Sequence, residues 1–313
     1  MAKKTVLVTG ASGFIGRPLV EQLRTAGYLV RAAVRRPVSF SKPVDLAIIP
    51  NLRDPIDWKP ILSGVNIVIH LAGMAHASFR DAPSDLFERV NTIATKNLVD
   101  ASKEVGIERF VFISSVRAQI GPSSVSIVRE ADDAHQTNDY GRTKLVAEAA
   151  VRASGVPFTI LRPVAIYGPH PKGNIKGLMR LAMMPFPLPM RGLISRRSFL
   201  GIDNFISAIL FVLNTPAAVS GTYLVAGTQT FTVSEFVTML RKAQGRPPGL
   251  IYLPPALLRF ALILLNRSRL WPRIAEDLIV DTGKLGALGW RPAVDTYEGI
   301  VAMVEAETGA ATS

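Results

Sequence analysis

The chain has 313 residues, of which 48% are hydrophobic and 19% charged, so it can bury the core of one large domain, or of a domain with a smaller lobe. It contains no cysteine, which excludes disulfides, thiolate metal sites and a cysteine nucleophile. The net charge of +12 suits an anionic substrate or surface. Because the sequence has no long basic run, zinc-finger pattern or RNA-binding signature, we expect no nucleic-acid partner.

No stretch is apolar over the roughly 18 residues that a membrane span needs, and the apolar run after Lys3-Lys4 is too short for a signal peptide. We therefore expect a cytoplasmic protein. Residues 255–271 are both apolar and basic. We expect this segment to be a helix packed on a second lobe or at a subunit interface. The alternative is a helix that lies on a membrane surface.

Strands and helices alternate through the first half of the chain. The strands are unbroken apolar runs, which indicates a parallel sheet covered on both faces, a doubly wound α/β fold. The predicted strands are Thr5 to Thr9, Leu29 to Val34, Asn66 to Leu71, Arg109 to Ser114 and Phe158 to Leu161. The predicted helices are Phe14 to Ala26, Ser84 to Val105 and Asp139 to Ala153. The segment 35–50 carries three prolines and is predicted to be irregular.

The pattern loosens after Gly168. We expect a proline-rich loop over 183–190, a helix over 203–214, a strand over 222–226 and a helix over 233–244. These elements predict a Rossmann domain over 1–168, to which 199–226 returns. Residues 169–198 and 227–313 are then expected to form a smaller, mostly helical substrate-binding lobe.

The glycines of Thr9-Gly10-Ala11-Ser12-Gly13-Phe14-Ile15-Gly16 fall between the first strand and the first helix. Gly10 permits a tight turn, Gly13 lets the backbone approach a pyrophosphate, and Gly16 lets the helix pack closely on the strand. The helix N-terminus offers unpaired N–H groups to the phosphates. This context predicts a dinucleotide-binding loop that includes Ser12, Phe14 and Ile15.

Cofactor choice is expected at the end of the second strand, where an NAD site usually carries a carboxylate. This strand ends in Arg35-Arg36 and supplies no acid. Because two guanidinium groups suit a 2′-phosphate, the sequence favours NADP(H), with NAD(H) as the alternative.

Tyr140 and Lys144 are four residues apart, so on a helix they share one face. A nearby ammonium and an oxidised nicotinamide both favour the phenolate, so we expect the pKa of Tyr140 to fall. Such a tyrosine can accept a proton from an alcohol or donate one to a ketone. Ser114-Ser115 ends the strand that begins at Arg109, and a hydroxyl at this position can bind the reacting oxygen.

Together these segments resemble the extended short-chain dehydrogenase/reductase family, in particular its NAD-dependent epimerase/dehydratase branch, which includes the UDP-sugar 4-epimerases and 4-ketoreductases. The resemblance covers nearly the whole chain. The matching segments are TGASGFIG (9–16), HLAG (70–73), the segment from Asn91 to Asn97, FISS (112–115), YGRTK (140–144), RPVAIYGP (162–169), RRSFLGIDN (196–204) and LGWRP (288–292).

The resemblance implies a function for individual residues. Tyr140 is implied as the acid/base, Lys144 as its activator and ribose ligand, and Ser115 as the partner of the substrate oxygen. Asn91 is implied to support Lys144 through water. The cofactor-binding residues implied around them are Leu71, Ala72, Gly73, Pro163, Val164, and Asn51 with Leu52, where asparagine replaces the family's adenine-binding aspartate.

The substrate residues implied by the resemblance are Asn174 and Arg197, which match contacts to a nucleotide diphosphate, with Arg273 as a second arginine. The alternative for Arg197 is a salt bridge between the lobes. His76 follows the Ala72-Gly73 turn, from which it can line the substrate site. The histidines lack metal-ligand spacing, so we expect no metal.

We therefore expect hydride transfer at C4 of a UDP-hexose or UDP-N-acetylhexosamine, by epimerisation or ketone reduction, in a chain that can form a homodimer. The alternatives are an NADPH-dependent reductase of a non-sugar ketone and a non-catalytic NAD(P)-binding subunit. Two departures matter. Ser115 is followed by Val116-Arg117-Ala118 rather than by the family's valine-tyrosine-glycine run, and the acidic pair of sugar dehydratases is missing. A dehydratase is therefore not expected.

Overall fold

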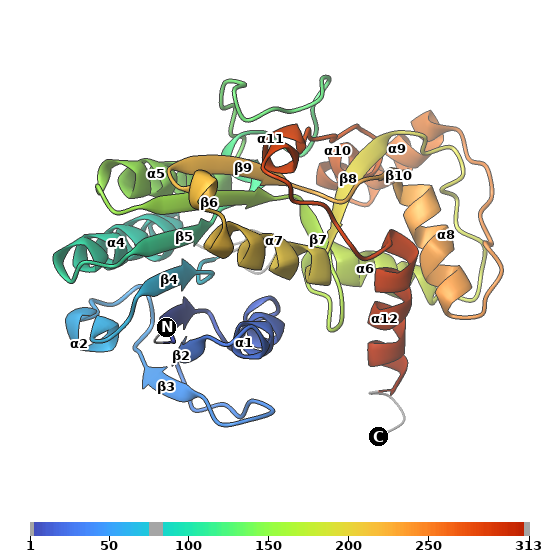
Figure 1. The fold of residues 1–313 in the computed structure, drawn as a ribbon. Coiled ribbons are helices and arrows are strands. Elements are labelled where there is room, and N and C mark those ends of the chain that lie inside the picture. The colour runs from blue at the N-terminus through green and yellow to red at the C-terminus, as the bar shows by residue number, and fades with distance from the viewer. Residues whose placement is uncertain (1–2, 75–83, 310–313) are drawn as a thin grey trace.

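Seven strands form one parallel sheet in the computed structural model, which describes residues 3–74 and 84–309 (Figure 1). Every neighbouring pair in this sheet is parallel, which confirms the predicted doubly wound α/β class. In order across the sheet, the strands are β3 (Asp45–Ile48), β2 (Leu29–Val34), β1 (Thr5–Thr9), β4 (Ile67–His70), β5 (Arg109–Ile113), β6 (Phe158–Pro163) and β9 (Gly221–Val225).

The strand order reverses next to β1. The chain proceeds from β1 through β2 to β3 on one side, and from β4 through β5 to β6 on the other. In such sheets the loops at the carboxyl ends of the strands separate at this point and leave a crevice for a ligand. The glycine loop follows β1, so it lies at the reversal.

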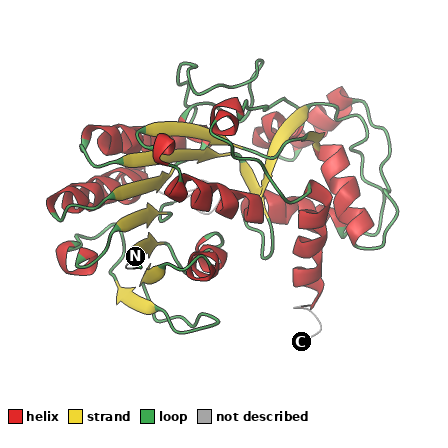
Figure 2. Ribbon diagram, viewed as in Figure 1, coloured by secondary structure: helices red, strands yellow, loops and turns green. Residues whose placement is uncertain are grey.

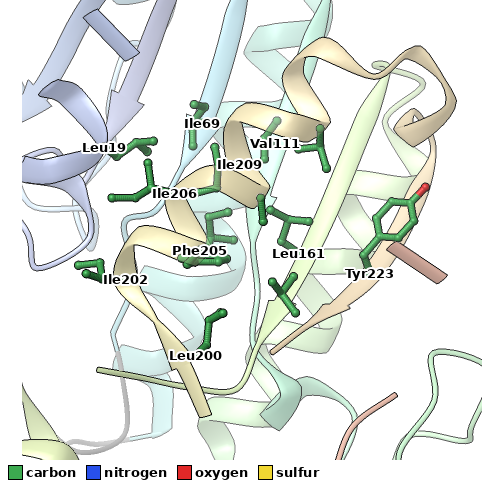
Figure 3. Packing of buried hydrophobic residues seen from close by; sticks show 14 of the residues in the cluster. Leu19, Ile69, Val111, Leu161, Leu200, Ile202, Phe205, Ile206, Ile209 and Tyr223 are labelled. Atoms are coloured by element: carbon green, nitrogen blue, oxygen red, sulfur yellow. The ribbon is translucent and has the colours of Figure 1, made fainter. Parts of the chain in front are cut away.

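Helices cover both faces of the sheet because alternate strand residues point to opposite sides. On one face, α1 and α7 pack on side chains such as Ile69, Val111 and Leu161 (Figure 3). On the other face, α2, α4 and α5 pack on a second cluster that includes Phe110 and Phe112. These helices are α1 (Gly16–Thr25), α2 (Lys59–Leu62), α4 (Ala94–Glu104), α5 (Asp139–Ala153) and α7 (Ile202–Asn214).

The second lobe is built on a small sheet in the order β10-β8-β7 and is mostly helical (Figure 2). Its core is separate from the other two and includes Tyr167, Phe199, Phe236 and Met303. Its strands are β7 (Ala165–Tyr167), β8 (Arg196–Gly201) and β10 (Thr230–Thr232). Its helices are α6 (Gly173–Ala182), α8 (Val233–Ala243), α9 (Pro255–Leu264), α10 (Trp271–Ile274) and α12 (Thr296–Gly309). Helix α11 (Gly283–Ala287) instead packs on β9, and its Leu285 belongs to the core of the large sheet.

Several elements differ from the sequence prediction, which did not include α2, α6, α11, α12, β7 or β10. The segment 35–50, predicted to be irregular, contains the edge strand β3. Its composition does not favour a strand, and the strand forms because it pairs with β2. The helix predicted over 84–105 consists of α3 (Ser84–Phe87), a π-helical segment (Glu88–Ile93) and α4. Strand β8 was not predicted, because its basic start obscures the strand pattern. The proline-rich segment 183–190 forms a loop, as predicted.

Within the described residues, no helix is both long enough and apolar enough to cross a bilayer. The apolar, basic segment 255–271 forms α9 and α10. No residue of α9 is buried. The expected packing on the second lobe is therefore limited: Leu258 is half-buried against the lobe's core, and Pro255, Ala261 and Leu262 are also half-buried.

A buried carboxylate joins α5 to β5 and β6. The Glu148 side chain is fully buried and accepts hydrogen bonds from Nε and Nη2 of Arg162 at 2.9 and 2.6 Å, and from Oγ of Ser114 at 2.6 Å. Nη2 of Arg152 donates a further bond at 2.7 Å. Burial raises the pKa of Glu148, but the bonds and charge of Arg162, with Ser114 and Arg152, outweigh it and hold the pKa below its ordinary value. Glu148 is therefore a buried anion.

We predict that Glu148→Gln destabilises the fold by about 3–5 kcal/mol, because it leaves the buried Arg162 guanidinium without its counter-charge. Urea unfolding measures this. The matched control is Asp100→Asn, which breaks the exposed ion pair of Asp100 with Lys96 and should cost less than about 1 kcal/mol. Equal losses in the two variants would contradict the assignment of Glu148 as the charged link.

Candidate active site

In the glycine loop after β1 the backbone lies so close to neighbouring backbone atoms that a side chain would not fit at Gly10 or Gly16. Gly10 has a φ of +70°, and a Cβ there would lie 3.0 Å from the amide nitrogen of Ala72. A Cβ on Gly16 would lie 2.1 Å from the carbonyl oxygen of Gly10, so only glycine lets α1 begin this close to the strand. No side chain caps the amino end of α1. The loop therefore presents backbone N–H groups at a helix N-terminus, which is the surface that binds phosphate.

The turn after β4 closes over this loop. Thr9 Oγ1 accepts a hydrogen bond from the amide of Ala72 at 3.2 Å. Asn91, in the π-helical segment, accepts a bond from the amide of Met74 at 2.8 Å and donates one to its carbonyl at 3.1 Å. A Cβ on Gly73 would lie 3.0 Å from Asn91 Oδ1 and 3.3 Å from Lys144 Nζ. Asn91 thus fixes the turn that lies against Lys144.

Tyr140 lies at the start of α5, next to Ser115 and Arg117. Burial raises the pKa of Tyr140, whereas its hydrogen bond with the Ser115 side chain and the positive charge of Arg117 lower it, and burial prevails. The expected lowering of this pKa is thus not seen in the protein alone. The cation that acts on the phenol is Arg117 rather than Lys144.

Lys144 lies one turn further along α5 and is buried. Its ammonium donates to the carbonyl of Ile113 at 2.9 Å and lies 4.6 Å from the centroid of the Phe112 ring. Burial lowers the pKa of Lys144 to about 8, against the opposing charge of Glu148. The structure therefore ties the ammonium to the end of β5 rather than to the phenol.

The two serines after β5 have different partners. Ser114 donates to the buried Glu148 and so belongs to the network behind the sheet edge. Ser115 instead caps the short 3-10 helix Val116–Ala118, where its Oγ accepts from the amide of Arg117 at 3.2 Å. Its contact with Tyr140 leaves Ser115 as the serine positioned for a reacting oxygen.

The remaining predicted cofactor residues follow the carboxyl ends of other strands. Arg35 and Arg36 follow β2, and both side chains are exposed. Asn51 accepts from the amide of Arg53 at 3.2 Å, while Leu52 packs against apolar side chains. At the other strand ends the structure places Leu71 and Ala72 after β4, Pro163 as the last residue of β6, and Val164 directly after it.

The predicted substrate residues belong to the second lobe. Arg273 Nη1 lies 3.4 Å from Asn174 Oδ1, so these two residues meet. Arg197 is more constrained: Nη1 donates to the carbonyls of Pro272 and Glu276, at 3.1 and 2.6 Å. Its Nη2 donates to the carbonyl of Pro122 at 2.7 Å. Arg197 thus joins the lobes through carbonyl oxygens, rather than through the salt bridge considered from the sequence. His76 lies outside the described residues.

Sequence reasoning missed Arg117 as a site residue. Burial, together with the charges of Arg273 and Arg197, lowers the pKa of Arg117 to about 10, while Tyr140 opposes this shift. The charges of Arg197 and Arg273 therefore reach Arg117, which in turn acts on the phenol. The signal was present in the sequence as the departure at Val116-Arg117-Ala118, but only the fold shows that Arg117 faces Tyr140.

A sequence model of the NAD dependent epimerase/dehydratase family matches residues 6–227. The chain belongs to this family. It is therefore an enzyme of the NAD-dependent oxidoreductase and epimerase class. The chain is 30% identical to UDP-glucose 4-epimerase of Vibrio cholerae over 306 residues, which cover 95% of this chain and 93% of the relative.

Two further comparisons widen the range of relatives. Ceramide reductase of Caulobacter vibrioides is 29% identical over 256 residues, covering 81% of this family member and 74% of the relative. Among solved structures, MoeE5 in complex with UDP-glucose and NAD is 26% identical, with a TM-score of 0.78 over 99% of this chain and 100% of that one. UDP-glucose 4-epimerase of Thermotoga maritima, at 21% identity and a TM-score of 0.80 over 98% of this chain and 99% of that one, shares the fold.

His70 lies in β4 behind the glycine loop and is fully buried between two threonines. Its Nδ1 lies 2.7 Å from Thr9 Oγ1, and its Nε2 lies 3.0 Å from Thr95 Oγ1. Burial, with the charge of Lys144, lowers the pKa of His70 to about 3. The ring is therefore neutral in the folded protein and serves to join β1, β4 and the helix that follows.

We predict that His70 makes the fold sensitive to acid. Between pH 6.5 and 3 the unfolded chain binds one more proton at this position, so the free energy of unfolding falls as the pH falls, by up to about 1.4 kcal/mol per pH unit. His70→Asn should flatten this slope in urea unfolding between pH 7 and 4.5. The matched control is His170→Asn at an exposed position, which should keep the wild-type slope. An unchanged slope in His70→Asn would refute the prediction.

Proposed function

We propose that the protein catalyses epimerisation at C4 of a UDP-hexose or UDP-N-acetylhexosamine, with the lobe of 169–198 and 227–313 binding the sugar nucleotide. The observation that carries this proposal is the close packing of the start of α5, which bears Tyr140, on the segment Ser115–Arg117: a Cβ on Gly141 would lie 2.2 Å from the carbonyl oxygen of Arg117. This contact lies at the carboxyl end of β5, on the sheet edge that also carries the glycine loop. The similarity to UDP-glucose 4-epimerase over nearly the whole chain favours epimerisation over one-way ketone reduction.

The residues at this edge can move one proton at one oxygen. The nicotinamide, when bound, supplies an acceptor for the hydride that leaves C4 and later returns it. Tyr140 accepts the proton of the C4 hydroxyl as the C4–H bond breaks, and gives it back when the ketone is reduced on its other face. Ser115 holds the oxygen by a hydrogen bond during both steps. Arg117 stabilises the phenolate with its positive charge.

Lys144 and Asn91 organise the surroundings of this pair. A Cβ on Gly73 would lie 3.3 Å from the buried ammonium of Lys144. Because glycine has no side chain, room remains beside the ammonium for a cofactor ribose. Asn91 holds the backbone of Met74 and thereby the position of Gly73. In this proposal Lys144 binds the ribose, and Asn91 is a positioning residue.

We propose NAD as the cofactor. The glycine loop fits a dinucleotide, because Cβ atoms at Gly10 and Gly13 would occupy the space beside the backbone. The preference for NADP(H) drawn from Arg35 and Arg36 is not supported: the family is described as NAD dependent, and MoeE5 was solved with NAD. Both arginines are exposed after β2 and can serve as ordinary solvated side chains.

The sugar nucleotide is proposed to bind across Asn174 and Arg273, which meet at the edge of the second lobe. Arg117 and Arg197 add positive charge beside this pair. A diphosphate suits such a site, because guanidinium groups bind phosphate oxygens through charge-assisted hydrogen bonds. Arg197 retains donor groups beyond the three that hold backbone carbonyls, since a guanidinium has five N–H donors.

The second candidate is a reductase of an apolar ketone. It is favoured by the similarity to ceramide reductase and to sterol demethylase protein B of Methylococcus capsulatus, which is 29% identical over 282 residues. The mutual influence of Arg117, Arg197 and Arg273 weighs against this candidate, because an uncharged lipid ketone has no anionic group that could pair with guanidinium groups.

We predict that the purified protein interconverts C4 epimers of a UDP-hexose or UDP-N-acetylhexosamine with only catalytic amounts of NAD, as followed by chromatography of the sugar nucleotides. Tyr140→Phe should lower turnover by about 10²–10⁴-fold, because it removes the group that transfers the proton, while NAD binding persists. The matched control is Tyr28→Phe, which removes the hydroxyl of a half-buried tyrosine bonded to Asn214 and should leave turnover normal. Undiminished turnover in Tyr140→Phe would contradict the mechanism.

We predict that ligands stabilise the protein selectively. NAD should raise the melting temperature more than NADP at equal concentration, and UDP should raise it further when added to the NAD complex. A ligand at about 100 times its Kd adds about 2.7 kcal/mol to the free energy of unfolding. A larger shift with NADP would support the sequence-based prediction that Arg35 and Arg36 bind the 2′-phosphate. No shift with UDP would favour the apolar ketone.

A further inference from the structure

Helix α9 turns a row of large apolar side chains toward solvent. The exposed fractions of Leu257, Phe260 and Leu264 are 55%, 59% and 71%. These residues are spaced at i, i+3 and i+7, which places them on one side of the helix. Ile263 and Leu265 are also exposed, and no residue of α9 is buried. A ten-residue helix of this composition is normally buried in a core, so its exposure needs a partner.

The residues just before α9 extend this apolar surface. Ile251 and Tyr252 are both exposed. They are held there by backbone hydrogen bonds to the proline-rich loop, from the amide of Ile251 to the carbonyl of Leu188 at 2.9 Å, and from the amide of Arg191 to the carbonyl of Ile251 at 3.2 Å. We call the set of Ile251, Tyr252, Leu257, Phe260, Ile263, Leu264 and Leu265 the α9 face. It lies at the end of the molecule away from the large sheet (Figure 1).

The charge around the α9 face is of one sign. From Phe236 to Ala275 the sequence contains no Asp or Glu and seven Arg or Lys residues. In the described part of the chain, no carboxylate lies within ion-pair distance of Arg259, Arg267 or Arg269. Arg259 lies over the Trp271 ring, with 5.8 Å between its guanidinium carbon and the ring centroid. The partner of this face must therefore accept both apolar side chains and positive charge.

We propose that the α9 face docks on the surface of an anionic lipid bilayer. An amphipathic helix of this kind lies in the plane of the interface, with Leu and Phe among the acyl chains and Arg at the headgroups. Trp271 is half-buried at the boundary of the patch, a position that tryptophan favours at membrane interfaces. The alternative partner, a second copy of this chain, would bring two surfaces of like charge together, because a two-fold interface pairs the same surface, with Arg259, Arg267 and Arg269, with itself.

Vesicle co-sedimentation tests this. The full chain is mixed with vesicles of phosphatidylcholine alone, or of phosphatidylcholine and phosphatidylglycerol in equal parts. We expect binding to the anionic vesicles only, weakened by about 0.5 M NaCl because salt screens the headgroups. The triple variant Leu257→Asp, Phe260→Asp, Leu264→Asp should abolish binding, whereas Ile48→Asp, at an exposed position on β3, should not.

A charge variant keeps the test independent of any effect of the apolar substitutions on folding. Arg267→Gln with Arg269→Gln should weaken binding to anionic vesicles by about 30-fold, since each basic side chain near such a surface contributes roughly fivefold. Arg53→Gln with Arg89→Gln changes the net charge equally at exposed sites on the other lobe and should have little effect.

Three results would overturn the proposal. The first is failure of the wild-type chain to sediment with anionic vesicles at low salt. The second is equal binding by the triple Asp variant. The third is a change from dimer to monomer in the triple variant, seen by analytical ultracentrifugation, with vesicle binding unchanged. That last result would assign the α9 face to a contact between copies of the chain.

Discussion

The close approach of α5 to the segment that follows β5 determines the rest of the site. A Cβ on Gly141 would lie 2.2 Å from the carbonyl oxygen of Arg117, so only glycine allows this contact. The residue before Gly141 is Tyr140, and the segment it touches carries Ser115 and Arg117. One backbone contact thus brings the phenol, the hydroxyl and a guanidinium together. Asn138 helps by capping α5, with its side chain accepting from the amide of Gly141 at 2.9 Å.

Two charged side chains are buried behind this contact. Glu148 is buried and bonded to Arg162, while Lys144 is buried one turn away with its ammonium on the carbonyl of Ile113. The positive charge of Arg117 acts on Tyr140. Buried charges are costly unless each is paired or hydrogen-bonded. The Glu148 network therefore supports the site without entering the reaction, and it explains why Ser114 is unsuited to bind a substrate.

The second lobe combines two surfaces of different chemistry. Arg197 and Arg273 come from β8 and α10, and their charges act on Arg117. A few residues earlier in the chain, α9 exposes apolar side chains flanked by further arginines. Arg273 and α9 both belong to the stretch from Phe236 to Ala275, which lacks acidic residues. The net charge of +12 is thus concentrated where the protein is proposed to meet a diphosphate and an anionic bilayer.

The sequence by itself determined the features that depend on local spacing: the glycine loop, the buried strands of the sheet, and the pairing of Tyr140 and Lys144 on one helix. Local spacing sufficed because each depends on backbone sterics or helical periodicity within a few residues. Only the tertiary structure showed that Arg117 faces Tyr140, that Arg197 is held by backbone carbonyls and that α9 is exposed. These are contacts, or missing contacts, between segments far apart in sequence. Strand β3 escaped prediction for the same reason, because its order comes from pairing with β2.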